Sequence, residues 1–476
     1  MHRLARLDHQ YVWHPFTQMR DWLRREPIVI VEGQGAVLGD VHGRRFLDAN
    51  SSIWTNLHGH AHPRINAAIR RQLGRVAHSS ALGFANEPAS LLASRLVAAA
   101  RPIRAAEAGA DLRKVFFSDD GSTAMEVALK LAYETARRKQ GAIAPRFLSL
   151  KGAYHGDTVG AVSLGHIDLF HRAYKGLLFR TGKVMAPYCY RCPFNRAKPE
   201  RTDARLARKC DWECVGQVEK TLDQGQRRGK PFSSFVVEPL MQGAAGMIPQ
   251  PQGWLKKVAA LCRERGISII ADEVMTGFGR MGVSDPAANA GARAPLFACQ
   301  QESVVPDYLV LAKGLTGGYM PMAATLTTQG VFDAFLGEYE EFKTFFHGHS
   351  FTGNQLGAAA ALASLDLLQS AVEIRRRLRL QRLLERELQR LWSLAHVGDV
   401  RQVGLVAGIE LVRDWKTRQP FALQERAGIR VCDAMAKRGV LTRPIGSVVV
   451  LLPPYCTTEA QLVAMVDALI YGIKAL

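Results

Sequence analysis

Short apolar runs alternate with amphipathic stretches between about residues 70 and 340, and this alternation predicts most of the fold. Runs such as Ile267–Ala271 and Leu309–Ala312 are typical of strands that are buried on both faces. The stretches between them carry apolar residues three and four positions apart, which predicts helices that pack on the sheet. The pattern therefore predicts an α/β protein with a mainly parallel central sheet that is covered by helices.

A lysine directly follows one of these strands. Lys313 lies between Leu309–Ala312 and the turn residues Gly314, Gly317 and Gly318, so it leaves the strand at the carboxyl end, where open α/β sheets bind ligands. A partly desolvated amine loses its proton more readily and can condense with a carbonyl group. The alternative is a surface lysine that begins a loop, and this stretch alone does not separate the two interpretations.

A carboxylate ends a second strand. Asp272 follows Ile267–Ala271 and precedes Lys313 by 41 residues, which leaves room for a crossover between parallel strands. A buried carboxylate needs a cationic partner. The ring nitrogen of pyridoxal phosphate is such a partner, and this cofactor also needs a lysine for its aldehyde. A helix N-cap is the alternative role for Asp272, but it does not explain the pairing with Lys313.

A strand, a turn and a long helix provide a phosphate-binding pattern. The strand Val115–Ser118 is followed by "DDGST" and then by apolar residues at helical spacing. We expect Ser122 or Thr123 to cap this helix, with Glu126 in support. Free N–H groups at a helix N-terminus attract a phosphate dianion, so the turn predicts where the phosphate of the cofactor binds.

Length and composition predict two domains and no membrane segment. The chain has 476 residues, of which 47% are hydrophobic, enough for one large and one small domain. We expect residues 1–69 and 345–476 to form a smaller α+β domain, and 70–344 to form the large domain, with a cysteine-containing insertion at 185–232. No apolar run is long enough to span a membrane, and the start lacks the apolar core of a secretory signal. A cytoplasmic protein is therefore expected.

The net charge of +19 raises the alternative of a nucleic-acid-binding protein. Many arginines fall in "EIRRRLRLQRLLERELQRLW", where Ile374, Leu378, Leu384 and Leu388 recur at helical spacing. This pattern predicts an amphipathic helix with a solvated basic face. Because no additional segment is left over for a DNA-binding module, we expect no nucleic-acid partner.

Four cysteines form two close pairs in a basic segment. Cys189 and Cys192 are followed by Cys210 and Cys214, a spacing found in structural zinc sites. The simpler interpretation is four reduced cysteines in a surface insertion, with no metal. Either way, we expect these residues to lie away from the chemistry.

Five motifs, in this order along nearly the whole chain, resemble the class III pyridoxal-phosphate aminotransferases of fold type I. They are "SDDGSTAMEVALKLA", "AYHGDTVGAVSLG", "VVEPLMQGAAGM", "ADEVMTGFGRMG" and "LAKGLTGGYMP". The stretches "VWHPFTQM", "SSIWTNLHGHAHP", "FFHGHSFTGNQLG" and "VLTRPIGSVVVLLPPY" resemble a branch that converts 8-amino-7-oxononanoate to 7,8-diaminononanoate in biotin synthesis. The resemblance implies ping-pong amino transfer between a small-molecule donor and a keto acid, in a homodimer with shared active sites.

The resemblance also implies roles for individual residues. Lys313 would hold the cofactor and move the proton, Asp272 would pair with the ring nitrogen, and Tyr154 would stack on the ring. Further cofactor contacts are implied for Gly121, Ser122 and Glu238, and for Ser350 toward the neighbouring subunit's cofactor. Substrate contacts are implied for Trp54, Phe16, Arg280 and Arg443.

The amino donor stays open at this point. Phe16, Ile53 and Val450 stand where the S-adenosylmethionine-using pattern has tyrosine, tryptophan and tyrosine, and a lysine-using branch also exists. Other ω-amino acid aminotransferases, such as those acting on acetylornithine or 4-aminobutyrate, share the lysine, the aspartate and the phosphate turn. The main motifs therefore do not exclude these enzymes.

Overall fold

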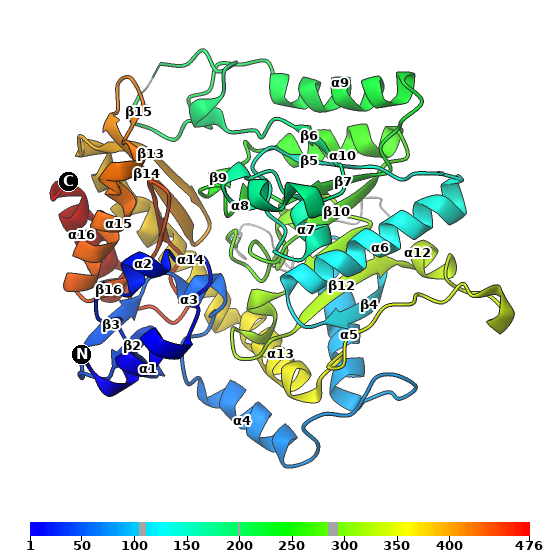
Figure 1. Ribbon diagram of the computed structural model, residues 1–476, viewed down its shortest axis with the longest axis horizontal. Helices are drawn as coiled ribbons and strands as arrows, with labels where there is room; N and C mark the ends of the chain where they lie inside the picture. Colours follow the sequence, from blue (N-terminus) through cyan, green and yellow to red (C-terminus); the bar gives the residue numbers. More distant parts are fainter. Residues whose placement is uncertain (104–110, 199, 284–293) are drawn as a thin grey trace.

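A seven-stranded sheet forms the centre of the computed structural model, which describes residues 1–103, 111–198, 200–283 and 294–476. The strand order is β4-β12-β11-β10-β7-β5-β6 (Figure 1). The strands are β4 (Leu112–Ser118), β5 (Phe147–Leu150), β6 (Gly182–Val184), β7 (Ser234–Val237), β10 (Ser268–Asp272), β11 (Tyr308–Leu311) and β12 (Ala323–Thr328). Five neighbouring strands run parallel to one another, namely β6, β5, β7, β10 and β11. β12 is antiparallel to its two neighbours, β11 and β4. The predicted mainly parallel sheet is confirmed.

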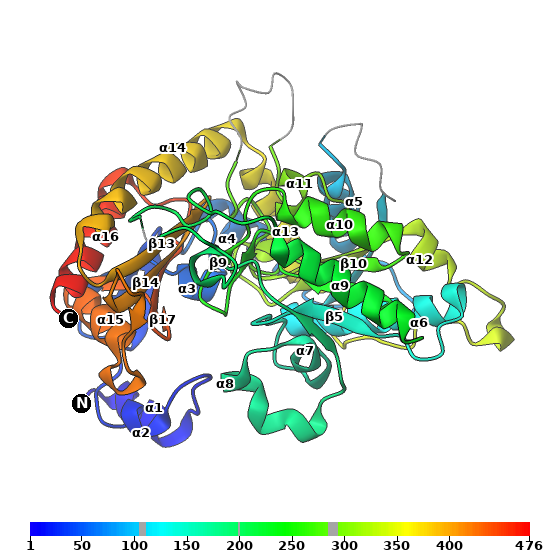
Figure 2. The same cartoon turned by 90° about the horizontal axis from the view of Figure 1, so that it is seen from above.

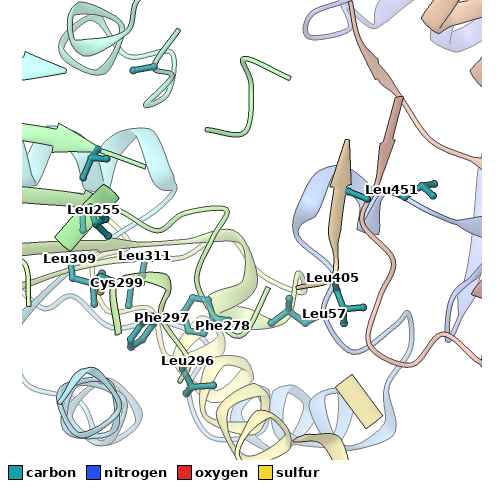
Figure 3. Close-up of a cluster of buried hydrophobic side chains, with 14 of the residues drawn as sticks. Leu57, Leu255, Phe278, Leu296, Phe297, Cys299, Leu309, Leu311, Leu405 and Leu451 are labelled. Carbon is teal, nitrogen blue, oxygen red and sulfur yellow. The ribbon is translucent and has the colours of Figure 1, made fainter. Parts of the chain in front are cut away.

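Both faces of this sheet are buried. Because successive residues of each strand point to opposite sides, they belong to two different clusters of apolar side chains. Ile270 and Val310 belong to a cluster with the helix α6 (Gly121–Gln140). Ile269, Leu309 and Leu311 belong to a second cluster on the other face. That face is covered by α5 (Glu87–Ala100), α9 (Glu213–Arg227) and α10 (Trp254–Glu264). Figure 3 shows part of the second cluster, with Leu255 of α10 beside Leu309 and Leu311.

A second layered unit lies on the left in Figure 1. Its sheet has the order β13-β14-β18-β17, and β15 pairs with β14. The strands are β13 (Val397–Val403), β14 (Val406–Asp414), β15 (Gln419–Pro420), β17 (Pro444–Ile445) and β18 (Val448–Leu451). Three helices accompany them, namely α14 (Ala371–Leu388), α15 (Ala427–Lys437) and α16 (Glu459–Lys474).

The two ends of the chain share a third sheet. Its order is β1-β2-β3-β16, with β1 (Ile30–Gln34), β2 (Val37–Asp40), β3 (Arg45–Asp48) and β16 (Val440–Leu441). β16 runs parallel to β3, and Val440 pairs with Leu47. This pairing agrees with a small domain built from both ends of the chain, although boundaries near 69/70 and 344/345 stay a prediction.

The remaining elements connect or cover these sheets. They are α1 (Arg3–Tyr11), α2 (Met19–Trp22), α3 (Ser51–Trp54), α4 (Pro63–Leu73), α7 (Val159–Leu164), α8 (Asp168–His171), α11 (Ala298–Gln301), α12 (Gln329–Asp333), α13 (Gln355–Leu368) and the short pair β8 (Met241–Gln242) and β9 (Ile248–Pro249). Figure 2 shows α9 and α10 side by side, and α13 packs against α4 and α5. Across the described ranges, no single helix is long and apolar enough to cross a membrane, and one bent pair, Gln355–Leu368 with Ala371–Ser393, passes by length and composition only.

The arginine-rich helix α14 is amphipathic, as predicted, but one of its basic residues is not solvated. Leu380, Leu384 and Leu388 are buried in the core. Arg377 is only 1% exposed, and its Nη2 donates to the carbonyl of Leu368 at 2.7 Å. The prediction of a fully solvated basic face is therefore wrong for Arg377, which ties α14 to α13.

Candidate active site

A cavity of about 660 Å³ lies at the carboxyl ends of the central strands. Residues that follow β4, β5, β7, β10 and β11 line it, together with residues 54 and 55. Seven of the predicted site residues are in this lining: Trp54, Gly121, Ser122, Tyr154, Glu238, Asp272 and Lys313. The fold therefore brings together residues that lie far apart in the sequence.

Lys313 and Asp272 meet because they end neighbouring parallel strands. Asp272 pairs in register with Val310, three residues before the lysine. Burial lowers the pKa of the Lys313 amine below its ordinary value, while the carboxylates of Asp272 and Glu238 oppose that shift. The Lys313 Nζ lies 5.0 Å from the centroid of the Trp54 ring. An amine held in this way exchanges its proton more readily than a surface lysine.

A buried histidine supports Asp272, and the sequence reasoning missed it. His155 Nδ1 lies 2.7 Å from Asp272 Oδ2, and the backbone N–H of Val274 donates to Asp272 Oδ1 at 3.0 Å. Burial is the largest influence on His155 and opposes its protonation, but the hydrogen bond to Asp272 and the charges of Asp272 and Glu238 together raise the pKa of the histidine. The available signal was its position directly after Tyr154 in "AYHGDT".

Glu238 is a second buried carboxyl group at the same edge of the sheet. Its oxygens accept from the backbone N–H of Gly243 at 2.8 Å and of Tyr154 at 3.2 Å. Burial is the main cause that raises the pKa of Glu238 to about 7, and the charge of Asp272 adds to it. Glu238 therefore changes its protonation near neutral pH, within reach of Asp272 and His155.

Tyr154 presents an aromatic ring to the cavity. Its hydroxyl donates to Asp157 Oδ2 at 2.7 Å, and burial together with this carboxylate raises the pKa of Tyr154 above its ordinary value. The ring stays neutral and is held near Phe16 and Phe170, with centroids 6.5 and 6.2 Å away. An aromatic face of this kind suits a flat, electron-poor ligand ring.

The N-terminus of α6 enters the cavity through Gly121 and Ser122. A Cβ on Gly121 would lie 2.7 Å from Val274 Cγ1, so only glycine allows this approach to the residues after Asp272. Ser122 Oγ accepts from the backbone N–H of Thr158 at 2.9 Å. This corner therefore presents backbone N–H groups and a hydroxyl, which suit a phosphate.

The predicted cap of α6 requires a correction. Asp120 is the N-cap, because its carboxylate accepts from the backbone N–H of Thr123 at 2.9 Å. Thr123 completes the capping box by accepting from the backbone N–H of Asp120 at 3.0 Å. Glu126 does not support the cap; it accepts from Thr158 Oγ1 at 2.6 Å. The cap is two positions before Ser122 and three before Thr123, so Ser122 is not needed as the cap and lines the cavity.

Trp54 reaches the cavity from a turn of rare handedness. Ser51, Ser52, Ile53 and Trp54 have φ angles of 45°, 47°, 62° and 70°, which form one turn of left-handed helix. Each non-glycine residue in this conformation costs roughly 1–2 kcal/mol. Backbone strain of this kind persists only where the surroundings fix it, and it is concentrated at functional sites.

Asp48 is the residue that fixes this turn. It is 3% exposed and accepts from Ser52 N at 3.0 Å, from Ser52 Oγ at 2.8 Å and from Asn50 N at 3.3 Å. His60 Nε2 lies 3.1 Å from Asp48 Oδ2, the oxygen that also accepts from Ser52 Oγ. On the far side of the turn, Trp54 Nε1 donates to Asn50 Oδ1 at 2.9 Å. The carboxylate of Asp48 thus holds the backbone that orients Trp54.

Phe16 and Arg443 lie together outside the cavity lining. The Phe16 side chain is 56% exposed, and Arg443 Nη2 donates to its carbonyl at 3.2 Å. Since the Phe16 ring lies near that of Tyr154, which lines the cavity, this pair stands at the entrance. Neither residue contacts the floor of the site.

Arg280 does not occupy the predicted position, and we correct that assignment. It is 1% exposed and outside the cavity lining. Its guanidinium donates to the carbonyl oxygens of Pro453 and Asn56, each at 2.8 Å. An arginine that is committed to two backbone carbonyls braces the fold behind the site instead of holding a substrate carboxylate.

Ser350 and the four paired cysteines also lie outside the cavity. Ser350 is exposed, and its carbonyl accepts from His78 Nε2 at 2.9 Å. The cysteines line a separate small cavity that shares no lining residue with the large one. Within the described part of the chain, no group of three or more histidine, cysteine, aspartate or glutamate side chains is already arranged to hold a metal ion.

Comparison with known proteins agrees with this geometry. The family model described as "Aminotransferase class-III" matches residues 19–473. The chain belongs to the class III aminotransferases. Its architecture is that of fold type I pyridoxal-phosphate-dependent transaminases, which are its structural neighbours.

Relatives of this aminotransferase match over almost their full lengths. An adenosylmethionine-8-amino-7-oxononanoate aminotransferase from Geobacter sulfurreducens is 47% identical to this chain. The matched region includes 97% of this chain and 95% of the relative. The crystal structure of the Methanocaldococcus jannaschii protein of the same name has a TM-score of 0.88 at 38% identity, covering 99% and 98% of the two chains. An amine transaminase from an uncultivated Pseudomonas species, in its PLP-bound form, has a TM-score of 0.85 at 31% identity, covering 98% of each.

Pyridoxal 5′-phosphate is the cofactor of this aminotransferase, and the residues of the cavity fit it. The lysine, the His155-supported carboxylate and the start of α6 supply partners for its aldehyde, its ring nitrogen and its phosphate. Two further features leave room for a ligand: the close approach that Gly121 permits, and His155 Nε2, which is buried without a hydrogen-bond partner among the described residues.

We predict that Asp48→Asn raises the KM for the keto substrate about tenfold while kcat changes less. The amide cannot accept all the hydrogen bonds that hold the left-handed turn, and such losses cost about 1–3 kcal/mol. Trp54 would then move away from its place over Lys313. Steady-state kinetics of the purified, cofactor-loaded enzyme measures the effect.

Asp40→Asn is the matched control. Asp40 is also 3% exposed and also holds backbone N–H groups at the end of a strand, those of His42 and Arg44 at 3.0 and 2.8 Å, but it does not contact the turn. A loss of thermal stability without a change in KM is expected for it. Equal KM changes in both variants would contradict a specific role for Asp48.

Proposed function

We propose that this aminotransferase transfers an amino group to the ketone of 8-amino-7-oxononanoate, which gives 7,8-diaminononanoate for biotin synthesis. The observation that carries the proposal is the near full-length similarity to proteins named for this substrate, at 47% and 48% identity over 97% and 98% of the chain. The ω-transaminase structures match equally well in shape, with a TM-score of 0.87, but at only 26% identity. The sequence similarity therefore favours the biotin reaction over that second candidate.

In this proposal, three residues hold the cofactor from three sides. Lys313 would hold the cofactor through its amine, Asp272 would pair with the protonated ring nitrogen, and Ser122 with the start of α6 would bind the phosphate. When bound, pyridoxal phosphate supplies a ring that withdraws electrons and so stabilises negative charge on the adjoining carbon. His155 orients the carboxylate of Asp272, and this pairing contributes to the raised pKa of the histidine.

Lys313 also moves the proton in this proposal. The free amine of Lys313 would be the base that removes the proton from the carbon bearing the donor nitrogen, and its conjugate acid would return a proton. The lowered pKa of this lysine increases the neutral, proton-accepting fraction at working pH. The Trp54 ring, 5.0 Å from Nζ, shields this amine from water.

We assign recognition of the substrate to the cavity wall and its entrance. Trp54 provides an apolar surface for the carbon chain of 8-amino-7-oxononanoate. Arg443 is the candidate partner for the carboxylate at the far end, because it is an exposed arginine at the entrance, next to Phe16. Arg280 takes no part in this proposal.

The amino donor is either S-adenosylmethionine, as in the names of the relatives, or lysine. Of the three positions that differ from the S-adenosylmethionine pattern, only Phe16 stands at the entrance. Ile53 is 44% exposed on the left-handed turn, and Val450 is 1% exposed in an apolar cluster on which Trp54 packs. Neither of them lines the cavity.

We propose a homodimer in which Ser350 of each subunit reaches the cofactor phosphate of the other. Ser350 lies outside the cavity of its own chain and is exposed. The segments around it present apolar side chains to solvent, with Leu82, Phe84, Phe346 and Phe351 exposed by 89%, 72%, 68% and 58%. The ring of Phe351 lies 4.7 Å from that of His78, which places the segment around Ser350 beside the segment that leads to Leu82 and Phe84. Exposed apolar side chains in neighbouring segments suit a protein interface.

A single-turnover assay tests the reaction itself. S-adenosylmethionine, lysine and glutamate are offered separately to the cofactor-loaded enzyme, and 8-amino-7-oxononanoate is then added. We expect one donor to convert the absorbance of the bound cofactor and the keto acid to reverse the change, with 7,8-diaminononanoate detected by mass spectrometry.

Two variants control this assay. Lys313→Ala should lose turnover and the covalent cofactor link, which intact-mass measurement after borohydride reduction reports, whereas Lys220→Ala on the exposed side of α9 should behave like wild type. If the enzyme aminated the keto acids that correspond to 4-aminobutyrate and related ω-amino acids, and did not respond to 8-amino-7-oxononanoate, the proposed substrate would be wrong. Only the membership of the aminotransferase family would then remain.

Replacing Asp272 by asparagine should lower kcat about a hundredfold or more, because the ring nitrogen loses its anionic partner. Binding of the cofactor to Lys313 should persist, since the strand and the lysine are intact. Stopped-flow measurement of the donor half-reaction reports the rate of proton removal.

Asp307→Asn provides the comparison for that experiment. Asp307 is half-buried beside β10 and accepts from Ile269 N at 2.7 Å, but it lies at the opposite ends of the strands. The Asp307→Asn variant should be less stable than the wild type, with an unchanged rate of proton removal. A near wild-type rate in Asp272→Asn would refute the proposed pairing.

The dimer proposal predicts that Ser350→Ala weakens cofactor binding about tenfold, since a hydrogen bond to a charged group contributes roughly 1.5–3 kcal/mol. Ser350→Thr keeps the hydroxyl and should retain wild-type affinity. Titration of the apoenzyme gives the affinities, and sedimentation velocity gives the mass. A monomer with full cofactor affinity would exclude the shared site.

A further inference from the structure

Four cysteines stand at the two ends of one irregular segment. Cys189 begins the 3-10 turn Cys189–Arg191 and Cys192 follows it, whereas Cys210 precedes α9 and Cys214 lies in its first turn. The described residues between Cys192 and Cys210 form neither helix nor strand. In Figure 1 this part of the chain runs along the top of the molecule, between β15 and α9. A segment without regular structure needs another source of order.

The fold brings all four thiols around a single small space. They line a cavity of about 10 Å³ together with Pro187, Asn195, Arg208, Trp212, Glu213 and Pro251. A space of this size holds about one water-sized sphere. All four cysteines are free thiols, so no disulfide accounts for their convergence.

The surrounding charge suits an anionic cluster. Arg208 Nη1 donates to Cys210 Sγ at 3.2 Å. Residues 191–209 contain seven arginines and lysines but only two acidic residues. Cys214 lies in the first turn of a 15-residue helix, and the N-terminal end of a helix favours negative charge. Arg191, Arg196 and Arg205 form ion pairs with Glu410, Asp211 and Asp203. Arg208 lines the thiol cavity, as does Glu213, and the Arg208 guanidinium would offset part of the two negative charges of a divalent cation bound by four thiolates.

We propose that Cys189, Cys192, Cys210 and Cys214 form a tetrahedral structural site for a zinc ion. The spacing Cys-x₂-Cys and Cys-x₃-Cys matches such sites, and the fold places both pairs around the same space. No group of the described side chains is arranged to hold a metal ion as it stands, so binding would require the sulfurs to move to about 2.3 Å from the ion. Four thiol protons leave to solvent as four zinc–sulfur bonds form, and no electron is transferred.

Such a site would brace the contact between the large sheet and the C-terminal sheet. On one side, Pro251 lines the thiol cavity, and the preceding Gln250 donates to the carbonyl of Glu238 at 2.9 Å. On the other side, Arg201 of the same segment donates to the carbonyls of Val397 and Leu394, both at 2.6 Å. The zinc ion would therefore stabilise the fold around the active site and take no part in amino transfer.

The test is the metal content of the cofactor-loaded enzyme, produced without a histidine tag in zinc-supplemented medium. Elemental analysis should find about one zinc per chain in the wild type. The pair variant Cys189→Ser with Cys192→Ser should lose that zinc, and its melting temperature should fall by about 5 °C or more, with kcat close to wild type. Cys432→Ala, which removes a buried thiol of α15 outside the cluster, should keep the zinc.

A second measurement on the wild type does not depend on whether a variant folds. Co²⁺ is added to the demetallated enzyme, and the visible spectrum should show the d–d and thiolate charge-transfer bands of tetrahedral sulfur coordination. Zinc that the pair variant retains, absence of both zinc and the cobalt bands in the wild type, or disulfides between these cysteines in peptide mass maps would each overturn the proposal. Loss of zinc in the pair variant alone, together with the cobalt bands, supports it.

Discussion

The burial of opposite charges at the ends of β10 and β11 is the constraint on which the rest of the site depends. A carboxylate and an amine are both expensive to remove from water, and each of these strands ends in one. The carboxylate is satisfied by His155 and by the backbone N–H of Val274. Burial leaves the amine less basic than it would be in water. The core of the sheet thus fixes both reactive groups before any ligand binds, so little reorganisation is left for the reaction itself.

The remaining walls of the cavity come from segments that the central sheet does not control. Gly121 allows α6 to begin against Val274, and Asp48 holds a strained turn that carries Trp54. Gly121 thus sets the position of the start of α6, and the carboxylate of Asp48 sets the position of the Trp54 ring. The energetic cost of the strained backbone is offset by buried hydrogen bonds, which is the arrangement expected where geometry serves a ligand.

Most of the fold and the centre of the site could be predicted from the sequence, because both follow from local pattern. The apolar runs predicted the strands. Because the sheet fixes the position of a residue at the end of a strand, Lys313, Asp272 and Glu238 could be predicted to lie at the site. The position of the α6 cap and the role of Arg280 could not be predicted this way. The helix begins before Ser122 because Asp120 caps the N–H of Thr123, and several residues in "DDGST" could have been the cap. Arg280 is held by carbonyls of Asn56 and Pro453, which no local pattern reveals. His155 was missed because its importance comes only from a contact 117 residues away.

The turn that carries Trp54 also has a consequence for how the protein is made. Its framework is completed by the last quarter of the chain: Ala49 N donates to Leu441 O, Leu452 N donates to Ala49 O, and Ser51 Oγ donates to Leu452 O at 2.6 Å. A ribosome that synthesises the chain from its N-terminus therefore exposes β3 and the strained turn long before their partners exist. The central sheet can assemble during translation, whereas the substrate wall must wait for residues near 450. The nascent protein passes through a stage with an open strand edge, when it depends most on protection from aggregation.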